Sequence, residues 1–372
     1  MNDSALRLLF VVKSLATEAG GAERVLCEIC SELAERGHST TIASFDHPNS
    51  ADFYLIDRSV ERIRLGLGKT DRRTGLLELM LRILGLRSLQ CKLRPDVTIG
   101  FMHSAYIPLS IATLGSETRI IASEHIAYEH YRQRRVERFL LNAIAPRCAA
   151  FTVPLEDVRR GFPDAIRNRM TVIPNPVALR ASSHQSARGA RRRLLFVGNF
   201  RAQKDHRTLI DAFARLAARH SDWDLRLVGE GPLRADIERH VGALGLQSRV
   251  TFTGAVTGVS EEYATADVFV IPSAYESFGL ATAEALANGI PAVGFADCPG
   301  TNQIIQDGKN GILVDGSDRV QALAAGLDRL MNSAELRESL GQQGPASVEH
   351  YSLAAVVDRW EELLRSVSQQ HS

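Results

Sequence analysis

The sequence lacks any apolar run long enough to span a lipid bilayer. Its longest apolar stretches have the length of a β-strand, whereas a membrane-spanning helix needs about 20 residues. The N-terminus, Met-Asn-Asp-Ser, has no basic segment, and Leu6–Val12 is too short to be the core of a signal peptide. We therefore expect a cytoplasmic protein without a membrane-spanning segment.

Motifs for metal binding are also missing. There are five cysteines, and the one close pair, Cys27 and Cys30, has no second cysteine or histidine pair to complete a zinc site. Buried free thiols in a reducing compartment are the better interpretation. His125, Glu129 and His130 form an H-x3-E-H pattern, which differs by one residue from the spacings of zinc proteases. We expect no metal and no other cofactor.

The chain has no dinucleotide-binding fingerprint. Gly20-Gly21-Ala-Glu23 follows a predicted strand and opens a predicted helix, but it is not G-x-G-x-x-G. No suitable acidic residue follows a second strand, so the pattern does not favour a nicotinamide enzyme. The two glycines let the backbone approach a ligand, and the helix end favours negative charge. A plain strand-to-helix turn is the alternative interpretation.

The net charge of +1 conceals a basic N-terminal half and an acidic C-terminal half. Two stretches, residues 69–94 and 131–141, combine basic and apolar residues. In the first stretch the basic residues are Lys69, Arg72, Arg73, Arg82, Arg87, Lys92 and Arg94. Such stretches suit a helix on an anionic membrane surface, although an amphipathic helix packed on its own domain would look the same. No stretch of the sequence has basic residues interspersed with aromatic residues, so we do not expect a nucleic-acid partner.

Alternation of buried strands and helices predicts an α/β protein with two doubly wound parallel-sheet domains that face each other across a cleft. The predicted domains are residues 1–177 and 191–351, joined by a linker at residues 178–190. The C-terminal helix, within residues 352–372, is expected to pack back on the first domain. The predicted strands are Leu6–Val12, Val97–Gly100, Ile120–Ser123, Ala150–Val153, Leu194–Val197, Leu225–Val228, Val250–Thr253, Val268–Ile271 and Ala292–Gly294.

Two carboxylates eight positions apart are the most informative feature. Glu276 follows the strand that ends near Ser273, and strand ends of this kind bind ligands in open α/β sheets. A helix from Leu280 to Asn288 places Glu284 about two turns in, too far for a cap. The amides from Ser277 through Phe278 and Gly279 to Leu280 lie near the helix N-terminus, where a phosphate would bind. The alternative interpretation is a strand–turn–helix with two surface charges.

Three further loops follow predicted strands, and each offers a ligand-binding residue. Arg201 and Lys204 lie after the strand that ends at Val197, and they are suited to neutralising a diphosphate. Gly229 and Glu230 follow the next strand of the same domain. His125 ends a strand of the first domain, where it is placed to contact a substrate oxygen. Solvated surface charges and a hydrogen-bonded core histidine are the alternatives.

Taken together, these segments resemble the retaining GT-B glycosyltransferases of family 4. The likeness runs in order along nearly the whole chain. It rests on Gly20-Gly-Ala-Glu23, Ser123-Glu-His125, Val172-Ile-Pro-Asn-Pro176, the Gly198–Lys204 loop, Val228-Gly-Glu-Gly-Pro-Leu233, Glu276 with Glu284, and the Gly300–Val314 segment. One departure is Asn199, which stands where the family usually has arginine, and Arg201 is the candidate replacement.

The resemblance implies a role for each matching residue. Glu276, Lys204 and His125 would be catalytic: Glu276 binds hydroxyls of the transferred sugar, Lys204 carries charge of the leaving diphosphate, and His125 lies beside the donor sugar. Glu284 would bind the ribose. The expected contacts to sugar and phosphate come from Gly20, Gly21, Arg201, Gly229, Glu230, Ser277, Phe278, Gly279 and Leu280. The family transfers with retention and needs no metal.

The implied function is transfer of a hexose or N-acetylhexosamine from a nucleotide sugar, with a UDP-sugar favoured, in surface polysaccharide or glycoconjugate biosynthesis. Ser123-Glu-His125 and Cys298-Pro-Gly-Thr-Asn-Gln resemble members that extend lipid-linked glycans. The expected acceptor is therefore a glycan on a polyprenyl diphosphate, and the expected location is the inner face of the cytoplasmic membrane. Two alternatives stay open: a small soluble acceptor, or a catalytically silent subunit that binds a nucleotide sugar.

Overall fold

The computed structural model describes residues 5–16, 20–68, 75–132, 134–178, 191–256 and 258–369. The chain divides into two compact units. The first unit is Met1–Pro176 together with Leu353–Ser372, and the second unit is Val177–Ser352. Most of the predicted linker, residues 179–190, lies outside the described residues.

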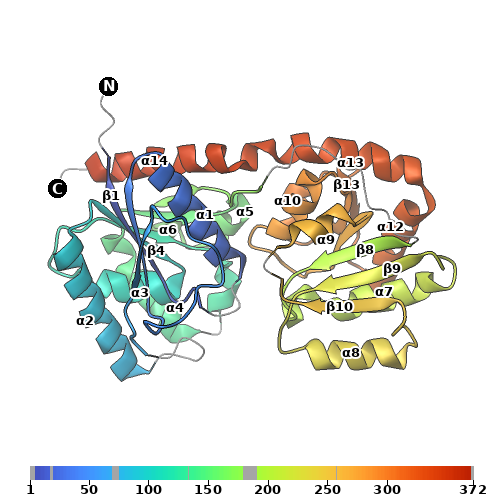
Figure 1. Cartoon of the computed structure of the whole chain (residues 1–372), viewed down its shortest axis with the longest axis horizontal. Helices are drawn as coiled ribbons and strands as arrows, with labels where there is room; N and C mark the ends of the chain where they lie inside the picture. The colour runs from blue at the N-terminus through green and yellow to red at the C-terminus, as the bar shows by residue number, and fades with distance from the viewer. Residues whose placement is uncertain are drawn as a thin grey trace. The chain divides into compact units, whose positions relative to one another are not determined.

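The described part of the first unit contains a seven-stranded parallel sheet with the order β3-β2-β1-β4-β5-β6-β7. Figure 1 labels its neighbouring strands β1 and β4. Its strands are β1 (Arg7–Val12), β2 (Ser39–Ser44), β3 (Glu61–Arg64), β4 (Val97–Phe101), β5 (Ile120–Ser123), β6 (Ala150–Val153) and β7 (Met170–Val172). The strand β1 lies between β2 and β4, with Phe10 opposite both Ile42 and Ile99. The strand order reverses between β1 and β4, which is where doubly wound sheets bind ligands.

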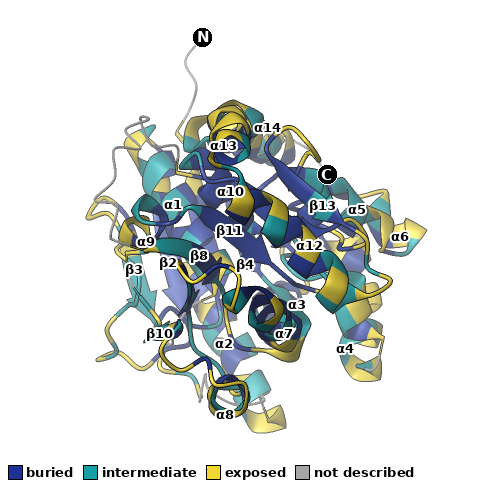
Figure 2. Cartoon of the chain, turned by 90° about the vertical axis from the view of Figure 1, so that its right-hand side faces the viewer, coloured by how far each residue is buried: buried dark blue, intermediate teal, exposed yellow. Residues whose placement is uncertain are grey.

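Helices cover this sheet in two groups. The helices α1 and α14 pack together, while α3 packs against α2 and α4. Their bounds are α1 (Gly21–Glu35), α2 (Leu76–Leu93), α3 (His103–Ala112), α4 (Arg135–Ile144), α5 (Glu156–Arg160), α6 (Asp164–Arg167) and α14 (Leu353–Gln369), with short 3-10 helices η1 (Tyr128–Tyr131) and η2 (Ala145–Arg147). Figure 2 shows central strands such as β4 and β11 as buried, and it shows exposed residues on the outward faces of the helices.

The described part of the second unit contains a six-stranded parallel sheet with the order β10-β9-β8-β11-β12-β13. The strands are β8 (Arg192–Val197), β9 (Trp223–Val228), β10 (Val250–Gly254), β11 (Val268–Ile271), β12 (Ala292–Phe295) and β13 (Gly311–Val314). The helices are α7 (His206–Ala217), α8 (Arg234–Ala243), α9 (Ser260–Ala264), α10 (Leu280–Ala287), α11 (Thr301–Ile304), α12 (Arg319–Asn332) and α13 (Ala334–Val348), with η3 (Ala202–Lys204) and η4 (Glu349–Tyr351). Here the order reverses between β8 and β11.

This architecture confirms the predicted fold class. All nine predicted strands are present, and β11 has the predicted bounds. Four strands, β2, β3, β7 and β13, were not predicted. The helix α1 ends as expected at a glycine, since Gly37 has a φ of 93° and left-handed glycine commonly ends a helix.

The helix α2 exposes an apolar face. Its first half turns Leu76, Leu77, Met80, Leu81 and Leu84 outward, with exposures between 43% and 83%. In contrast, Arg82 is 1% exposed, lies 4.5 Å from the centroid of the Phe45 ring, and donates to the Leu67 carbonyl. A neighbouring aromatic ring and a carbonyl thus hold the Arg82 charge inside the unit, so this residue of the basic stretch packs on its own domain and does not face a membrane surface.

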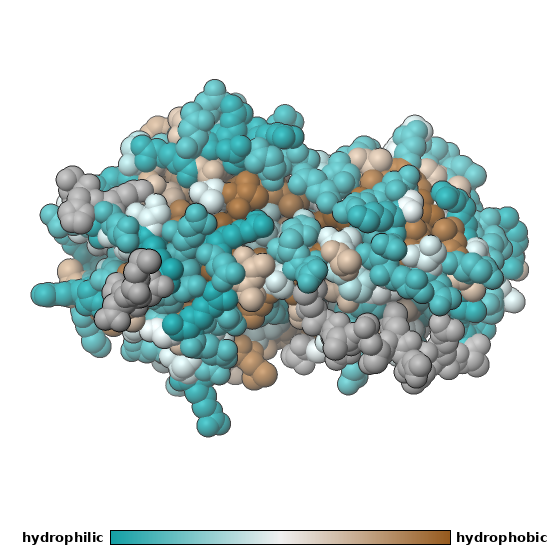
Figure 3. Space-filling view, turned by 90° about the horizontal axis from the view of Figure 1, so that it is seen from above, coloured by the Kyte–Doolittle hydropathy of each residue, from teal (hydrophilic) through white to brown (hydrophobic). Residues whose placement is uncertain are grey.

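The remaining basic residues of the 69–94 stretch differ in position. Arg87, Lys92 and Arg94 are exposed, while Lys69, Arg72 and Arg73 lie outside the described residues. Within the described part of the chain, no helix is both long and apolar enough to cross a membrane. Figure 3 shows mainly hydrophilic residues on the face that it displays, with hydrophobic residues between them.

Candidate active site

Polar side chains meet where β8 and β11 end, on either side of the reversal point of the second sheet. Lys204 Nζ donates to Oε1 of Glu276 at 2.6 Å, and Ser273 Oγ donates to the same oxygen at 2.5 Å. The Lys204 and Glu276 side chains are only 13% and 9% exposed. Two residues predicted to be catalytic are thus joined at the edge where such sheets bind ligands.

Close contacts fix the loop that carries Glu276. The Glu276 amide donates to the Pro299 carbonyl at 2.9 Å. A Cβ atom on Gly300 would lie 2.4 Å from the Glu276 carbonyl oxygen, and Gly300 has a φ of 85°, so only glycine fits there. The Ala274 amide donates to the Gln203 carbonyl at 2.9 Å. This last bond ties the Glu276 loop to η3, the short helix that ends at Lys204.

Arg319, the first residue of α12, supports the same loop from the other side. Its guanidinium donates to the carbonyl oxygens of Pro272 at 2.6 Å and Ser273 at 3.1 Å, and to Asp205 at 3.2 Å. The guanidinium carbon lies 3.7 Å from the centroid of the Phe295 ring. Arg319 therefore joins the end of β11 to the N-cap of α7, although it touches neither member of the ion pair.

The loop after β9 approaches the loop after β8 through glycine. A Cβ atom on Gly229 would lie 2.0 Å from the Gly198 carbonyl oxygen, and the φ of Gly229 is 139°. The Phe200 amide donates to the Glu230 carbonyl at 2.8 Å. A larger residue would push the loops apart, so Gly229 shapes the loop that leads to Lys204. Its direct contact with a ligand stays a prediction.

The helix α10 begins at the predicted position. Gly279 is its N-cap, with a φ of 86°, and Leu280 is its first residue. The Phe278 side chain is 3% exposed and packs against Tyr351, with the ring centroids 5.1 Å apart, so Phe278 can offer a ligand only its backbone. Ser277 is half-buried. The start of this helix offers amide N–H groups and the positive end of the helix dipole, which favour an anion.

Glu284 is the fifth residue of α10, which is little more than one turn in and not about two turns as predicted. Glu284 is 8% exposed. Tyr263, in α9, donates its hydroxyl to Oε2 of Glu284 at 2.8 Å and to the Ala281 carbonyl at 3.2 Å. The hydroxyl fixes one oxygen of this buried carboxylate.

Arg201 and Glu230 do not join the Lys204–Glu276 pair. Arg201 is exposed and lines a separate cavity of about 220 Å³ between α7 and α8. Glu230 forms an ion pair with Arg234. Their roles in substrate binding stay predictions.

In the first unit, His125 follows β5. Its Nε2 lies 2.9 Å from Ser123 Oγ, and its ring stacks on Phe101 with the centroids 4.9 Å apart. Its Nδ1 is buried and has no hydrogen-bond partner among the described residues. Burial lowers the pKa of His125 to about 4, and the nearby Asn175 side chain partly opposes this shift. The imidazole is therefore neutral near pH 7 and can exchange a hydrogen bond with a sugar hydroxyl.

Glu124 holds the turn that carries His125. Its carboxylate accepts from the amides of His125 at 2.9 Å and Ile126 at 3.0 Å, and from the hydroxyls of Tyr106 and Tyr131. Burial raises the pKa of Glu124, while the four hydrogen bonds lower it. These contacts make Glu124 a structural anchor for the turn.

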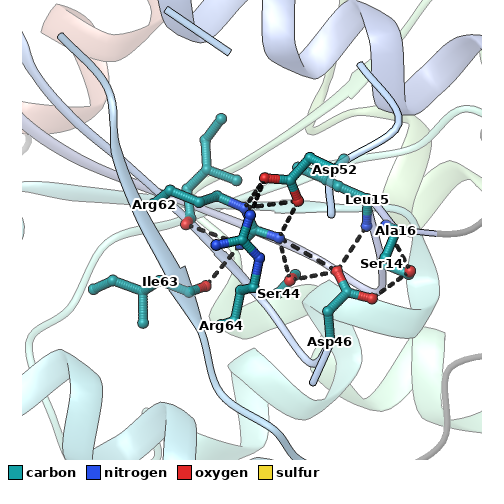
Figure 4. A network of polar contacts seen from close by, with 10 residues as sticks. Ser14, Leu15, Ala16, Ser44, Asp46, Asp52, Arg62, Ile63 and Arg64 are labelled. Atoms are coloured by element: carbon teal, nitrogen blue, oxygen red, sulfur yellow. Dashed lines mark hydrogen bonds and ion pairs between the residues drawn. The ribbon is translucent and has the colours of Figure 1, made fainter. Parts of the chain in front are cut away.

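The loop after β1 is anchored by Asp46, which follows β2 (Figure 4). Asp46 accepts from Ser14 Oγ at 2.5 Å and from the Leu15 amide at 2.8 Å. Arg62 donates to Asp46 at 3.3 Å and to Asp52 at 2.9 Å. In dinucleotide-binding folds an acidic residue after the second strand binds ribose, but here the carboxylate holds the chain's own loop.

The two N-terminal glycines lie at the start of α1, as predicted. Gly20 is the N-cap and Gly21 is the first helical residue. This places their amides at the positive end of a 15-residue helix. Binding of a ligand phosphate by these glycines stays a prediction.

Sequence reasoning missed the residues that position the site. Tyr263, Arg319, Tyr106 and Tyr131 each touch a site residue or its loop, but they belong to other elements of the fold. No local spacing connects them to their partners: Tyr263 lies 21 residues before Glu284. Only the tertiary structure brings these groups together.

Two family models together match most of the chain. The model for glycosyltransferase family 4 matches residues 19–180, and the model for glycosyl transferases group 1 matches residues 181–347. An uncharacterized glycosyltransferase of Haemophilus influenzae is 23% identical over 93% of this chain and 96% of its own. A Campylobacter jejuni relative is 25% identical over 97% of this chain and 99% of its own. It is the GalNAc-α-(1→4)-GalNAc-α-(1→3)-diNAcBac-PP-undecaprenol α-1,4-N-acetyl-D-galactosaminyltransferase.

Solved structures with the same fold cover almost the whole chain. Anabaena HepE in complex with UDP and glucose gives a TM-score of 0.80 at 20% identity, covering 97% of this chain and 100% of that one. TarM gives a TM-score of 0.81 at 14% identity, covering 97% and 99%. At these identities the structures show the fold alone.

Proposed function

The chain belongs to the GT-B glycosyltransferases of family 4, and from that premise we propose that it transfers a hexose or N-acetylhexosamine with retention of configuration. The proposed donor is a nucleotide sugar, and the proposed acceptor is a membrane-associated glycan. The observation that carries the proposal is the Lys204–Glu276 ion pair at the reversal point of the second sheet. At this position a buried cation can neutralise a diphosphate, and a buried carboxylate can accept a hydrogen bond from a sugar hydroxyl.

The chemical step needs charge stabilisation more than a protein nucleophile. As the bond between the sugar and the diphosphate breaks, negative charge grows on the leaving diphosphate. Lys204 and the N-terminus of α10 would stabilise that charge, and preorganised groups of this kind lower barriers by several kcal/mol. We propose that these groups take the place of a metal ion in the reaction.

The two glutamates would position the donor. Glu276 would accept hydrogen bonds from hydroxyls of the transferred sugar, and Glu284 would accept them from the ribose. Tyr263 supports the second role because its hydroxyl holds the Glu284 carboxylate in place. The solved structures of HepE and TarM include complexes with UDP, which supports UDP as the nucleotide.

We propose a polyprenyl-diphosphate-linked glycan as the acceptor. Support comes from the Campylobacter jejuni relative, whose substrate is linked to undecaprenol by a diphosphate. The neutral, largely buried His125 would contact a hydroxyl of the donor sugar or the acceptor.

Such an acceptor requires contact with a membrane surface. The docking face proposed for this contact is the set Leu76, Leu77, Met80, Leu81 and Leu84 of α2. The neighbouring helix α3 also packs against α4, which exposes Val136 and Phe139, each at 71%. The exposed Arg87 and Lys92 of α2 would add attraction to anionic lipids.

Ligand-dependent stabilisation tests the proposed donor. We would measure the thermal unfolding of the protein with UDP, GDP, ADP and their common sugar conjugates. A ligand at 100 times its Kd stabilises the folded state by about 2.7 kcal/mol, so one nucleotide and one of its sugars should raise Tm. The Glu284→Gln variant should lose most of this shift, whereas the exposed Glu261→Gln should keep it. If no nucleotide or nucleotide sugar shifts Tm at millimolar concentration, the result contradicts the proposed donor binding.

A further inference from the structure

Two histidines and a glutamate from separate segments of the first unit come together outside the roles proposed above. His103 begins α3, directly after β4, at the reversal point of the first sheet. His130 lies in η1, and Glu137 lies in the first turn of α4. One ring nitrogen of each histidine and one carboxylate oxygen all lie within 4.8 Å of one another. They form the one such group of three among the described residues.

Details of the geometry show that these side chains can converge on one ligand. His103 Nε2 lies 3.8 Å from Glu137 Oε2, and the centroids of the two imidazole rings are 5.6 Å apart. Nδ1 of His103 and Nε2 of His130 are buried and have no hydrogen-bond partner in the described structure. His103 presents Nε2, and not its unpaired Nδ1, to Glu137. A buried polar atom without a partner is costly, so the unpaired Nε2 of His130 is the one that indicates a group supplied from outside the chain.

We propose that His103, His130 and Glu137 bind a divalent zinc ion. Two imidazoles and one carboxylate are a known ligand set for zinc with an open fourth position. Hard cations such as Mg²⁺ and Ca²⁺ prefer oxygen ligands, so the two nitrogens select against them. This site differs from the H-x3-E-H pattern of the sequence, because Glu129 is exposed and the partner of His130 is His103.

Binding would require a modest closure of the cluster. Ligands about 2.1 Å from a tetrahedral ion lie roughly 3.4 Å from one another, so atoms that now lie within 4.8 Å of one another would approach by at most about 1.4 Å. Glu137 can supply that movement, since its side chain is 33% exposed. Arg134 now donates to both Glu137 oxygens, at 2.9 and 3.1 Å, but it is 37% exposed and can turn toward solvent.

Arg134 and Lys13 place positive charge close to His103. These charges oppose a cation, so we expect a site of moderate affinity. The open fourth position would take water or an anionic oxygen of a ligand. The proposal does not depend on the transferase reaction, because its test measures metal binding alone.

The experiment is a zinc titration of the full chain, purified without a histidine tag and treated with a chelator. Competition with a colorimetric zinc indicator would give the affinity, and elemental analysis after dialysis would give the stoichiometry. We expect one zinc per chain. His103→Ala, His130→Asn and Glu137→Gln should each weaken binding at least about tenfold, because even residues behind a metal ligand change affinity 10- to 100-fold.

Controls separate this site from others that bind zinc weakly. His47→Asn changes an exposed histidine of the same unit, and Cys91→Ser removes an exposed thiol. Both variants should bind zinc as the parent protein does. If His103→Ala also lowers Tm in the absence of zinc, Glu137→Gln decides, since this partly exposed residue can change without a cavity. Absence of zinc binding at one ion per chain, or equal affinity in Glu137→Gln and the parent protein, would overturn the proposal.

Discussion

Both units place polar groups at the end of a parallel sheet, but they hold these groups in different ways. In the second unit the groups satisfy one another: Lys204 binds Glu276, and Tyr263 binds Glu284. In the first unit, nitrogen atoms of His125, His103 and His130 are buried without partners in the described structure. His206 of the second unit also has two buried ring nitrogens without partners in the described structure, so the difference concerns the proposed ligand-binding groups. Lys204, Glu276 and Glu284 are preorganised by their own contacts, whereas the three histidines of the first unit leave hydrogen-bonding capacity for groups from outside.

Preorganisation has a physical consequence for the ligand. In the second unit a donor meets charges that are already positioned, which reduces the entropy lost on binding. In the first unit a ligand instead gains by satisfying atoms that are costly to leave unpaired. Substitutions in the two units should therefore differ in their balance of lost activity and lost stability.

The largest expected effect is on catalysis. Glu276→Gln keeps the shape of the side chain but removes its charge, so it should lower kcat/KM by roughly 100-fold or more, in the range seen for loss of one transition-state contact. Steady-state transfer assays would measure this change. The matched control is Glu261→Gln, which alters an exposed glutamate of the same unit. Equal activity of Glu276→Gln and the parent protein would remove Glu276 from the mechanism.

The next largest expected effect is on membrane binding, which should depend on the surface of the first unit and not on that of the second. The double variant Leu77→Glu, Met80→Glu places charges in the docking face and should weaken binding to phosphatidylglycerol vesicles at least about tenfold, since each buried apolar side chain contributes about 1.5–3 kcal/mol. Co-sedimentation would measure the binding. Leu244→Glu, at a 41% exposed leucine of the second unit, should leave it unchanged. Equal loss in both variants, or no vesicle binding by the parent protein, would contradict the proposed docking face.

The largest loss in the free energy of unfolding should come from breaking the Lys204–Glu276 ion pair in the second unit. Lys204→Met leaves the Glu276 carboxylate buried without its cation, and this should cost roughly 3 kcal/mol in the free energy of unfolding. Urea unfolding at pH 7 would measure the loss. The double variant Lys204→Met, Glu276→Gln should recover most of it, because no unpaired charge remains. An additive loss in the double variant would show that the two residues are not coupled.

The smallest expected effect is on the dependence of stability on pH, to which His125 of the first unit contributes. His125 has a pKa of about 4 in the folded protein, while an unfolded histidine titrates near 6.5. Between these values the unfolded state binds more protons, so stability falls as pH falls. His125→Gln should reduce the loss between pH 6.5 and pH 4 by roughly 2 kcal/mol, with little change at pH 7. Parallel curves for both proteins would show that His125 titrates normally.

Much of the fold could be predicted from the sequence because most central strands are continuous apolar runs. The strand β11, Val-Phe-Val-Ile, is buried throughout and has the predicted bounds. The strand β2 was missed because Ser-Thr-Thr-Ile-Ala-Ser is polar, and its burial comes from neighbours on both sides. The strand β3 was missed because it is an edge strand rich in charge, and Arg62 and Arg64 pair with Asp52.

The residues of the candidate site also fall into those that could be predicted from the sequence and those that could not. Lys204 and Glu276 could be predicted because each follows a recognisable strand, and parallel strands bring their carboxyl ends to one edge. Arg319 could not, since its contacts with Pro272 and Ser273 depend on where α12 packs. The cluster of His103, His130 and Glu137 was also invisible, because no motif spacing links three segments that only the fold brings together.

The central claim is that this protein transfers a sugar with retention from a nucleotide sugar to a lipid-linked glycan. The most direct measurement is an NMR determination of the new glycosidic linkage after incubation with α-linked UDP-sugars and a polyprenyl-diphosphate-linked acceptor. The account predicts an α-linked product with the parent protein and almost none with Glu276→Gln. A β-linked product, or no product from any donor that the protein binds, would contradict it.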